Sequence, residues 1–443
     1  MTCFYLLSLG CPKNTVESEG MRELLRHAGY QATDYPEEAE ILIVNTCGFI
    51  DLAREESLAA LRELGQIKGP DQYLIGAGCM AERYGVKMAT MVPLVDGIIG
   101  TRRWREIATL VQSLVRDHKP GVVCQLPQRV APHPLSHPPR RHRPGVASAY
   151  VKIAEGCNAP CAFCAIPQIK GPFHSKPREA ILTEVQELAQ QGIKETILIA
   201  QDTTAYGRDW GEEDALASLI NHIVKAIPDL PWLRIMYTYP QHITPCLIET
   251  MALNPQMCHY LDLPLQHAHP QVLRRMNRPH DIGQIHSLIA RLRGAMPDIA
   301  LRTSFIVGYP GETEEEFQAL LQFMDQIAFD RVGIFAYSQE ERTKAAALAG
   351  QIPQQIKEER YEQAMALQQG ISLRKNRRCV GRELQVLIEG LGDGISVGRS
   401  YRDAPEVDGI VVVQGECPVN EFAAVRITEA LEYDLIGMPE APT

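Results

Sequence analysis

AYVKIAEGCNAPCAFC, residues 149–164, joins a short apolar run to three closely spaced cysteines. Cys157, Cys161 and Cys164 have the spacing C-x3-C-x2-C, and the run before them has the length of a buried strand. Three thiolates on one loop suit three corners of an iron–sulfur cluster, whereas a structural zinc site needs a fourth protein ligand. The stretch therefore predicts a cluster with one open iron or a zinc site with a distant fourth ligand. Buried structural cysteines are the remaining alternative.

This run is the first of six that alternate with helical patterns such as residues 178–192 and 270–278. Such runs are typical of parallel strands, and six βα units without a return strand predict an open or partial (β/α)6 barrel. Active sites of such folds lie at the carboxyl ends of the strands, which is where the three cysteines stand. The six runs are AYVKIAEG (149–156), ETILIAQD (195–202), LRIMYTYP (233–240), YLDLPLQ (260–266), LRTSFIVGYPG (301–311) and RVGIFAYS (331–338).

Three more strand-like runs precede this region, each followed by a helical pattern: CFYLLSLG (3–10), EILIVNT (40–46) and YLIGAG (73–78). The expected helices cover residues 16–29, 54–66 and 81–92. One cysteine comes directly after each run: Cys11, Cys47 and Cys79. Parallel strands end at the same edge of a sheet, so we expect these three thiols to converge. They suit a second cluster with an open iron, although coincidental placement of buried cysteines is the alternative.

Composition changes divide the chain into four parts. Residues 1–124 form the N-terminal α/β domain, and residues 125–145 are a linker rich in Pro, His and Arg. Residues 146–374 form the partial barrel. From residue 375 to 443, short strands with Gly, Pro and Asp turns predict a small all-β barrel. The predicted fold class is therefore α/β, with a small β-barrel at the C-terminal end.

Composition also limits the function. No apolar run reaches the roughly 18 residues of a membrane span, and MTCFYLLSLG lacks a basic leader, so we expect a cytoplasmic protein. Twelve cysteines in a reducing compartment indicate metal or redox chemistry rather than disulfides. The net charge of −10 argues against a non-specific grip on nucleic acid. Residues 379–443 contribute −8 of it, from four Arg against twelve Asp and Glu.

The two cysteine triplets and the terminal β-barrel, taken together, resemble the methylthiotransferases of the radical S-adenosylmethionine (radical SAM) superfamily. The resemblance covers essentially the whole chain, and its β-barrel is of the kind called TRAM. The matching segments follow one another in order: SLGCPKNTVESE, VNTCGFID, GAGCMAERY, YVKIAEGCNAPCAFCAIP, IAQDTTAYG, YLDLPLQHAHPQVLRRMNRP, RTSFIVGYPGETEEEF and GRSYRDAPEVDG.

The resemblance implies a transferase with two 4Fe-4S clusters, one on each cysteine triplet. S-adenosylmethionine serves such enzymes as methyl donor and as radical source, with the radical formed at the Cys157, Cys161 and Cys164 cluster. The N-terminal cluster is expected to hold the sulfur that is inserted. The resemblance also implies a low-potential electron donor such as flavodoxin or ferredoxin, but it does not identify the sulfur donor.

Two segments favour one branch of this family. IAQDTTAYG (199–207) and GRSYRDAPEVDG (398–409) are similar to the branch that modifies the β-carbon of an aspartate in protein S-twelve of the small ribosomal subunit. The acidic last module agrees, because it would repel phosphates and attract a basic ribosomal protein. A tRNA adenosine methylthiotransferase is the alternative, and a non-catalytic iron–sulfur or zinc scaffold is a more remote one.

Eight residues near strand ends are expected to position S-adenosylmethionine, although core packing is the alternative role for each. They are Phe163, Gln201, Asp202, Gln266, His267, Gly308, Gly311 and Glu312. Four residues depart from the family pattern without removing a ligand. Glu17 stands where Asp is usual, Ala162 where Ser is common, and Lys170 and Lys176 where Arg is frequent. Lysine keeps the charge of arginine but not its bidentate geometry.

Overall fold

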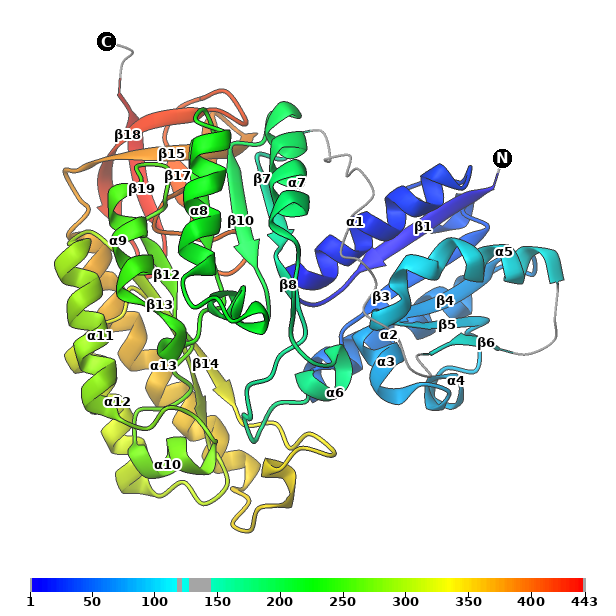
Figure 1. Ribbon diagram of the computed structural model, residues 1–443, viewed down its shortest axis with the longest axis horizontal. Coiled ribbons are helices and arrows are strands. Elements are labelled where there is room, and N and C mark those ends of the chain that lie inside the picture. Colours follow the sequence, from blue (N-terminus) through cyan, green and yellow to red (C-terminus); the bar gives the residue numbers. More distant parts are fainter. Residues whose placement is uncertain (1, 118–121, 127–144, 441–443) are drawn as a thin grey trace.

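The computed structural model describes residues 2–117, 122–126 and 145–440. An N-terminal α/β domain (blue to cyan in Figure 1) lies beside a central α/β barrel, and a small β-barrel (orange to red) caps the barrel's other side. Most of the predicted linker, residues 127–144, falls outside the described residues. The fold class predicted from the sequence is confirmed.

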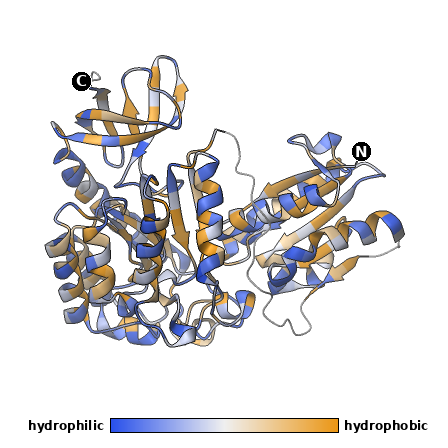
Figure 2. Cartoon of the chain, turned by 45° about the horizontal axis from the view of Figure 1, so that its top comes forward, coloured by the Kyte–Doolittle hydropathy of each residue, from blue (hydrophilic) through white to orange (hydrophobic). Residues whose placement is uncertain are grey.

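The N-terminal domain is built on one parallel six-stranded sheet in the order β2-β1-β3-β4-β5-β6. Every residue of β3 is buried, as expected for a central strand covered on both faces. Apolar residues fill the strands and the helix faces against them (Figure 2). The strands are β1 (Cys3–Ser8), β2 (Gln31–Ala32), β3 (Ile41–Thr46), β4 (Tyr73–Gly78), β5 (Gly97–Gly100) and β6 (Val123–Gln125).

The helices of this domain agree with the expected pattern except at one place. They are α1 (Pro12–His27), α2 (Asp51–Ile67), α3 (Cys79–Tyr84), α4 (Lys87–Met91) and α5 (Ile107–Asp117). The single helix predicted over residues 81–92 is wrong: it is broken into α3 and α4. Gly85 between them has φ +55°, a left-handed conformation that ends a helix and that glycine adopts without strain.

The central barrel has all six predicted strands, in two parallel three-stranded sheets. One sheet has the order β11-β10-β7 and the other β12-β13-β14. The two sheets meet where Thr238 N donates to Asp262 O at 3.1 Å, so the barrel is open on the side of β7 and β14. The strands are β7 (Ser148–Lys152), β10 (Glu195–Ile199), β11 (Trp232–Ile235), β12 (Tyr260–Asp262), β13 (Ala300–Val307) and β14 (Arg331–Ala336).

Helices cover the outside of these strands and bury one large apolar core between themselves and the sheets. They are α7 (Arg178–Gln190), α8 (Ala215–Ala226), α9 (Pro245–Leu253), α10 (Pro270–Arg275), α11 (Ile282–Ala295), α12 (Glu314–Ile327) and α13 (Gln354–Arg377). The cysteine loop is framed by the short pair β8 (Ala154–Glu155) and β9 (His174–Ser175) and by α6 (Ile166–Lys170).

The C-terminal module is a closed barrel in the order β15-β16-β17-β19-β18. Closure removes the unpaired strand edges that a sheet of this size would otherwise expose. Its strands are β15 (Glu383–Gly392), β16 (Ile395–Ser400), β17 (Val411–Val413), β18 (Phe422–Ala430) and β19 (Leu435–Pro439). None of the helices that the structure describes is long and apolar enough to cross a membrane.

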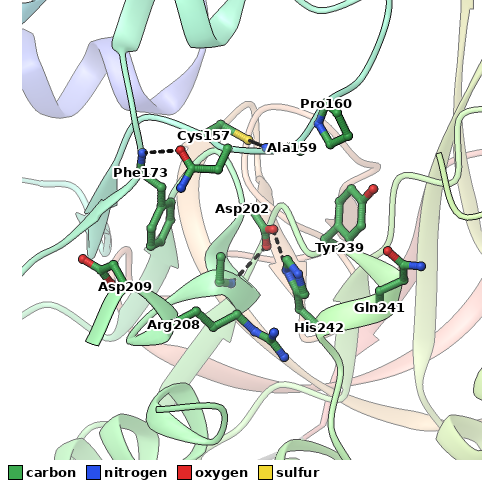
Figure 3. A pocket seen from close by; sticks show the side chains of 12 residues that line it. Cys157, Ala159, Pro160, Phe173, Asp202, Arg208, Asp209, Tyr239, Gln241 and His242 are labelled. Atoms are coloured by element: carbon green, nitrogen blue, oxygen red, sulfur yellow. Dashed lines mark hydrogen bonds and ion pairs between the residues drawn. The ribbon is translucent and has the colours of Figure 1, made fainter. Parts of the chain in front are cut away.

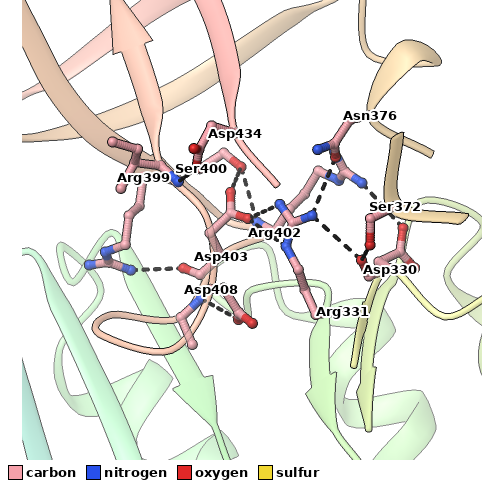
Figure 4. Close-up of polar contacts among 12 residues, drawn as sticks. Asp330, Arg331, Ser372, Asn376, Arg399, Ser400, Arg402, Asp403, Asp408 and Asp434 are labelled. Carbon is pink, nitrogen blue, oxygen red and sulfur yellow. Dashed lines mark hydrogen bonds and ion pairs between the residues drawn. The ribbon is translucent and has the colours of Figure 1, made fainter. Parts of the chain in front are cut away.

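Buried charges join this module to the central barrel. Glu195 of β10 is fully buried and pairs with Arg399 at 2.7 Å and Arg234 at 2.6 Å. Nearby, Arg331 pairs with Asp403, and Arg402 lies 3.2 Å from Asp330 (Figure 4). Desolvated charges are tolerated only with their partners in place, so these pairs hold the two modules in one arrangement.

Removing the charge of Glu195 is therefore expected to be costly. In Glu195→Gln, two buried guanidinium groups lose a counter-charge, and the free energy of unfolding should fall by about 3–5 kcal/mol. Glu421→Gln is the matched control, because Glu421 also joins the two modules through Lys194, but at an exposed site. That change should cost less than about 1 kcal/mol. Urea denaturation compares the two variants, and equal losses would contradict the prediction.

Candidate functional site

The cysteine loop of the central barrel begins with a turn that only glycine fits. Gly156 has φ +71°, and a Cβ at this position would collide with the backbone oxygen of Pro172. Beyond this turn, each of the three sulfur atoms accepts one hydrogen bond. The donors are Ala159 N to Cys157 Sγ (3.4 Å), Arg278 Nη1 to Cys161 Sγ (3.8 Å) and Ile166 N to Cys164 Sγ (3.5 Å).

The donor set of this loop fits a metal centre. Burial raises the pKa of Cys157 to about 11 and that of Cys164 to about 12. Both thiols are therefore neutral at physiological pH unless a cation draws off the proton, as metal ions do for coordinating thiols. The hydrogen-bond donors around them suit sulfur that carries negative charge.

Two cavities open at this loop and share residues 157–160 in their linings. One of about 310 Å³ is lined by Cys157 and by Asp202, Tyr239 and His242 at the strand ends (Figure 3). The other, of about 520 Å³, is lined by all three cysteines and by two exposed cations, Arg342 and Lys344. The loop thus lines one cavity at the strand ends and another next to Arg342 and Lys344.

Asp202 is the predicted positioning residue that lines the first cavity. One carboxylate oxygen accepts hydrogen bonds from Ala205 N at 3.1 Å and the Thr204 hydroxyl at 2.7 Å, and the other lies 2.8 Å from His242 Nδ1 (Figure 3). Its neighbour Gln201 has a buried Oε1 without a hydrogen-bond partner among the described residues. Asp202 is held firmly at the edge of this cavity, whereas Gln201 is not among the residues that line either cavity.

The N-terminal triplet converges as the parallel sheet requires. Cys11 precedes α1, Cys47 follows β3 and Cys79 opens α3, all at the carboxyl edge of the sheet. A Cβ on Gly10 would lie 2.7 Å from Cys47 Cβ and 3.0 Å from its Sγ, and Cys79 Sγ lies 3.5 Å from Asn14 Oδ1. Burial raises the pKa of Cys47, and that of Cys79 to about 12. These thiols also need a cation to ionise.

Neither triplet is arranged around a single ion. Within residues 2–117, 122–126 and 145–440, no three His, Cys, Asp or Glu side chains are grouped as the ligands of one metal ion. In an iron–sulfur cluster each thiolate binds a different iron, so its ligands do not have to meet at one point. The spacing of both triplets is therefore compatible with clusters.

One short segment of chain passes beside the supports of both triplets. Tyr237 and Tyr239 follow β11 and alternate along this segment. The ammonium group of Lys13, two residues after Cys11, lies 2.9 Å from the centroid of the Tyr237 ring. The guanidinium group of Arg278, which also donates to Cys161, lies 4.2 Å from the centroid of the Tyr239 ring. A tyrosine and a cation thus stand beside each triplet.

A buried charge network fastens the N-terminal domain to the barrel beside these triplets. Glu17 of α1 accepts from Lys152 of β7 at 2.9 Å and from Lys170 of α6 at 2.5 Å, and the Thr101 hydroxyl donates to it at 2.7 Å. Burial alone would raise the pKa of Glu17, but the two ammonium groups lower it to about 2. Two of the departures from the family pattern, Glu17 and Lys170, are therefore ion-pair partners.

A loop of the barrel, residues 338–345, contacts the supports of both triplets and is called the bridging loop below. Its Glu340 pairs with Arg83 of α3 at 2.7 Å, and Arg83 in turn donates to the Gly48 carbonyl, next to Cys47. At its other end, Ala345 N donates to Ala162 O, inside the barrel's cysteine loop, at 2.8 Å.

The other predicted positioning residues, apart from the exposed Gly311, are buried or half-buried around the strand ends. His267 is fully buried 3.5 Å from Glu312, and burial lowers the pKa of His267. A Cβ on Gly308 would collide with Lys357, whereas one on Gly311 would make only an ordinary contact with Arg275 Nε at 3.9 Å. Phe163 packs against an apolar cluster that includes Tyr309, and Gln266 bridges to Phe305 of β13 with φ +76°.

Several residues of the site carry no signal in the sequence that we recognised. Lys13, Tyr237, Tyr239, His242 and Arg278 are brought to the triplets by the fold. A partial signal existed, because both tyrosines stand at the end of a predicted strand, where such folds place ligands. Lys13 comes from a helix and Arg278 from a loop, so the positions of the strand ends did not predict that they would reach the site.

Comparisons with known proteins agree with this architecture. Residues 3–100 match the Uncharacterized protein family UPF0004, residues 151–324 the Radical SAM superfamily, and residues 380–439 the TRAM domain. Among solved structures, the radical S-adenosylmethionine methyltransferase TsrM from Kitasatospora setae has a TM-score of 0.56. That likeness, at 14% identity over 90% of this chain and 77% of TsrM, concerns the fold alone.

Curated relatives match over almost the whole chain. "Ribosomal protein uS12 methylthiotransferase RimO" of Roseiflexus sp. (strain RS-1) is 50% identical, over 99% of this chain and 98% of that protein. The protein of the same name from Chloroflexus aurantiacus is 48% identical, over 98% of this chain and 99% of that protein. Fold, cysteine loop and family model together define a radical SAM enzyme. Within that class, the chain belongs to the RimO family of methylthiotransferases.

The network around Glu17 predicts how the junction of the N-terminal domain and the barrel responds to acid. The pKa of Glu17 is about 2 in the folded chain against an ordinary 4.5, so its ionised form stabilises the fold by about 3 kcal/mol at neutral pH. That contribution is complete above about pH 4.5 and is lost as the pH falls towards 2. Glu17→Gln should lack it at every pH.

Urea denaturation between pH 7 and 3 measures this effect. The difference in free energy of unfolding between wild type and Glu17→Gln should be largest at pH 7 and shrink below pH 4.5. Glu23→Gln on the same helix is the control, because its partner Arg26 is partly exposed. A difference that stays constant across this range would contradict the assignment.

Proposed function

We propose that this chain inserts a methylthio group at the β-carbon of an aspartate in ribosomal protein uS12. The observation that carries the proposal is that one short segment, through Tyr237 and Tyr239, contacts a cation next to each cysteine triplet. A transferase that joins a sulfur from one centre to a carbon activated at another needs such a juxtaposition. The substrate is inferred from the names of relatives that match nearly all of the chain.

Two 4Fe-4S clusters and S-adenosylmethionine are the cofactors of this proposal. Cys157, Cys161 and Cys164 would hold one cluster, and Cys11, Cys47 and Cys79 the other. When bound, these groups supply one-electron chemistry, which activates a C–H bond that no acid or base in a protein can deprotonate. Two groups of three ligands each leave one iron per cluster open.

The chain's own residues bury and orient these centres. The donors Ala159 N, Ile166 N and Arg278 each offer a hydrogen to one sulfur of the barrel triplet. Such donors stabilise negative charge on thiolates and shift the reduction potential of a cluster upward. The buried positions of Cys47 and Cys79 keep water from the N-terminal triplet.

We assign the positioning of S-adenosylmethionine to the residues at the strand ends. Asp202, which lines the 310 Å³ cavity, and Gln201, whose Oε1 has no partner in the described part of the chain, are the polar groups best placed for contact. Gly311 is exposed and could approach the cofactor with its backbone. The remaining candidates would support the site from the core: Phe163, Gln266, His267, Gly308 and Glu312.

Charge supports a protein substrate. The last module has a net charge of −8 over residues 379–443, and ribosomal proteins are basic, so the two are electrostatically complementary. A low-potential donor such as flavodoxin or ferredoxin would supply the electrons. We place the reaction in the cytoplasm, where ribosomal proteins are made. A tRNA adenosine is the alternative substrate that the assay below includes.

Cysteine variants test the two-cluster assignment. After anaerobic reconstitution, wild type should contain about eight irons per chain, and Cys47→Ala and Cys157→Ala should each contain about four. The remaining cluster differs between the two variants, so electron paramagnetic resonance spectra of the reduced proteins should differ as well. Cys246→Ala, at an exposed position, is the control and should keep all the iron. Full iron content in Cys47→Ala would refute the second cluster.

The substrate is identified by mass spectrometry. The reconstituted enzyme, S-adenosylmethionine and a reductant are incubated with purified uS12 or with unmodified tRNA. We expect a mass gain of one methylthio group in place of a hydrogen on a uS12 aspartate, and none on tRNA. The same gain on tRNA alone would assign the chain's activity to the nucleic acid.

A further inference from the structure

Lys13 is a buried cation that lacks a hydrogen-bonding partner. Its side chain comes from the first turn of α1, and the residue is only 6% exposed. The ammonium group lies over the face of Tyr237, and no acceptor for its three N–H groups is found among the residues that the structure describes. A ring face attracts a cation but satisfies none of its hydrogen bonds. An ammonium group buried in this way is suited to an anion that arrives from outside the chain.

The nearest fixed acid does not fill this role. Asp262, at the end of β12, accepts from Arg302 Nη1 at 2.8 Å through one oxygen and from Tyr237 N at 3.0 Å through the other. Lys170 is also near Lys13 but is a cation paired with Glu17. Of the acidic groups that face Lys13, the carboxylate of Asp262 therefore already has partners, and the others are the thiols of Cys11 and Cys79.

The backbone beneath Lys13 is strained. Tyr237 has φ +62°, a left-handed conformation that is costly for a residue with a large side chain. Strain of this kind persists where the surrounding structure enforces it, and it is concentrated at functional sites. Here the ring of Tyr237 lies under the Lys13 ammonium group, and the backbone N–H of Tyr237 donates a hydrogen bond to the Asp262 carboxylate. The fold thus holds a cation at a fixed point beside the N-terminal triplet.

We propose that Lys13 binds the side-chain carboxylate of the substrate residue that is modified. This inference rests on the proposed function, which places an aspartate of uS12 between the two triplets. S-adenosylmethionine also carries a carboxylate, but its proposed place is at the Cys157, Cys161 and Cys164 triplet. Lys13 lies two residues from Cys11, in the opposite triplet. A charge-assisted contact here would select aspartate and fix its β-carbon relative to the sulfur centre.

Binding measurements with two versions of uS12 test this role. The reconstituted enzyme is kept without reductant, so that no turnover occurs, and its affinity for uS12 is compared with that for uS12 whose target aspartate is replaced by asparagine. Wild type should prefer the aspartate form by roughly tenfold or more. Lys13→Met should lose this preference, and Lys13→Arg should keep most of it because the charge remains.

A second lysine provides the matched control. Lys357 is 8% exposed and lies 5.2 Å from the Tyr337 ring, but its ammonium group donates to a backbone oxygen at 2.9 Å. Lys357→Met should keep the wild-type preference for aspartate. Iron content and affinity for S-adenosylmethionine are measured for every variant, and Lys13→Met should match wild type in both.

Each other outcome overturns the inference in a recognisable way. A Lys13→Met enzyme that still prefers the aspartate form leaves Lys13 without a role in recognition. Loss of iron in that variant would assign Lys13 to the N-terminal cluster, and weaker binding of S-adenosylmethionine with an intact aspartate preference would assign it to that cofactor. If wild type does not bind uS12 in either form, the proposed function fails and this inference fails with it.

Discussion

Parallel strands can deliver side chains to only one edge of a sheet, and this constraint governs the whole molecule. In the N-terminal domain it brings together three cysteines that are more than thirty residues apart in sequence. In the central barrel it places the cysteine loop after β7 and the Tyr237–Tyr239 segment after β11, at the same edge of one sheet with β10 between them. Function then depends on turning the two edges toward each other, which no single domain can do alone.

That orientation is maintained by groups that are stable only when the parts are docked. One apolar cluster includes Val16 of the N-terminal domain, Tyr150 of the barrel, and Leu387 and Ala404 of the C-terminal module. Apolar contact favours burial but tolerates sliding, whereas a buried ion pair requires one geometry. The pairs of Glu17 and Glu195 therefore add orientation to an association that the apolar surface drives.

The sequence was most informative where one local pattern decided the outcome. The six barrel strands could be predicted from apolar runs in the sequence. The N-terminal cysteines could be placed at strand ends because each one directly follows such a run. The short strands β2, β5 and β6 were missed, because segments of two to four residues are too short to show the alternation of apolar and polar residues that indicates a strand. Lys13 and Arg278 were missed for a different reason: their partners are rings far away in the sequence, and only tertiary packing brings them together. His267 was predicted from its place near a strand end, but its complete burial beside Glu312, just before α12, depends on packing that local patterns do not show.

The bridging loop gives the two triplets a fixed spacing. Within eight residues it is anchored through Glu340 to the support of Cys47 and through Ala345 to the cysteine loop of the barrel. A chain segment of that length, held at both ends by buried contacts, acts as a strut: neither triplet can shift without straining the other. The distance between the two cysteine triplets is thus set by the protein before any cofactor or substrate binds. The substrate therefore has to fit the space that this distance leaves.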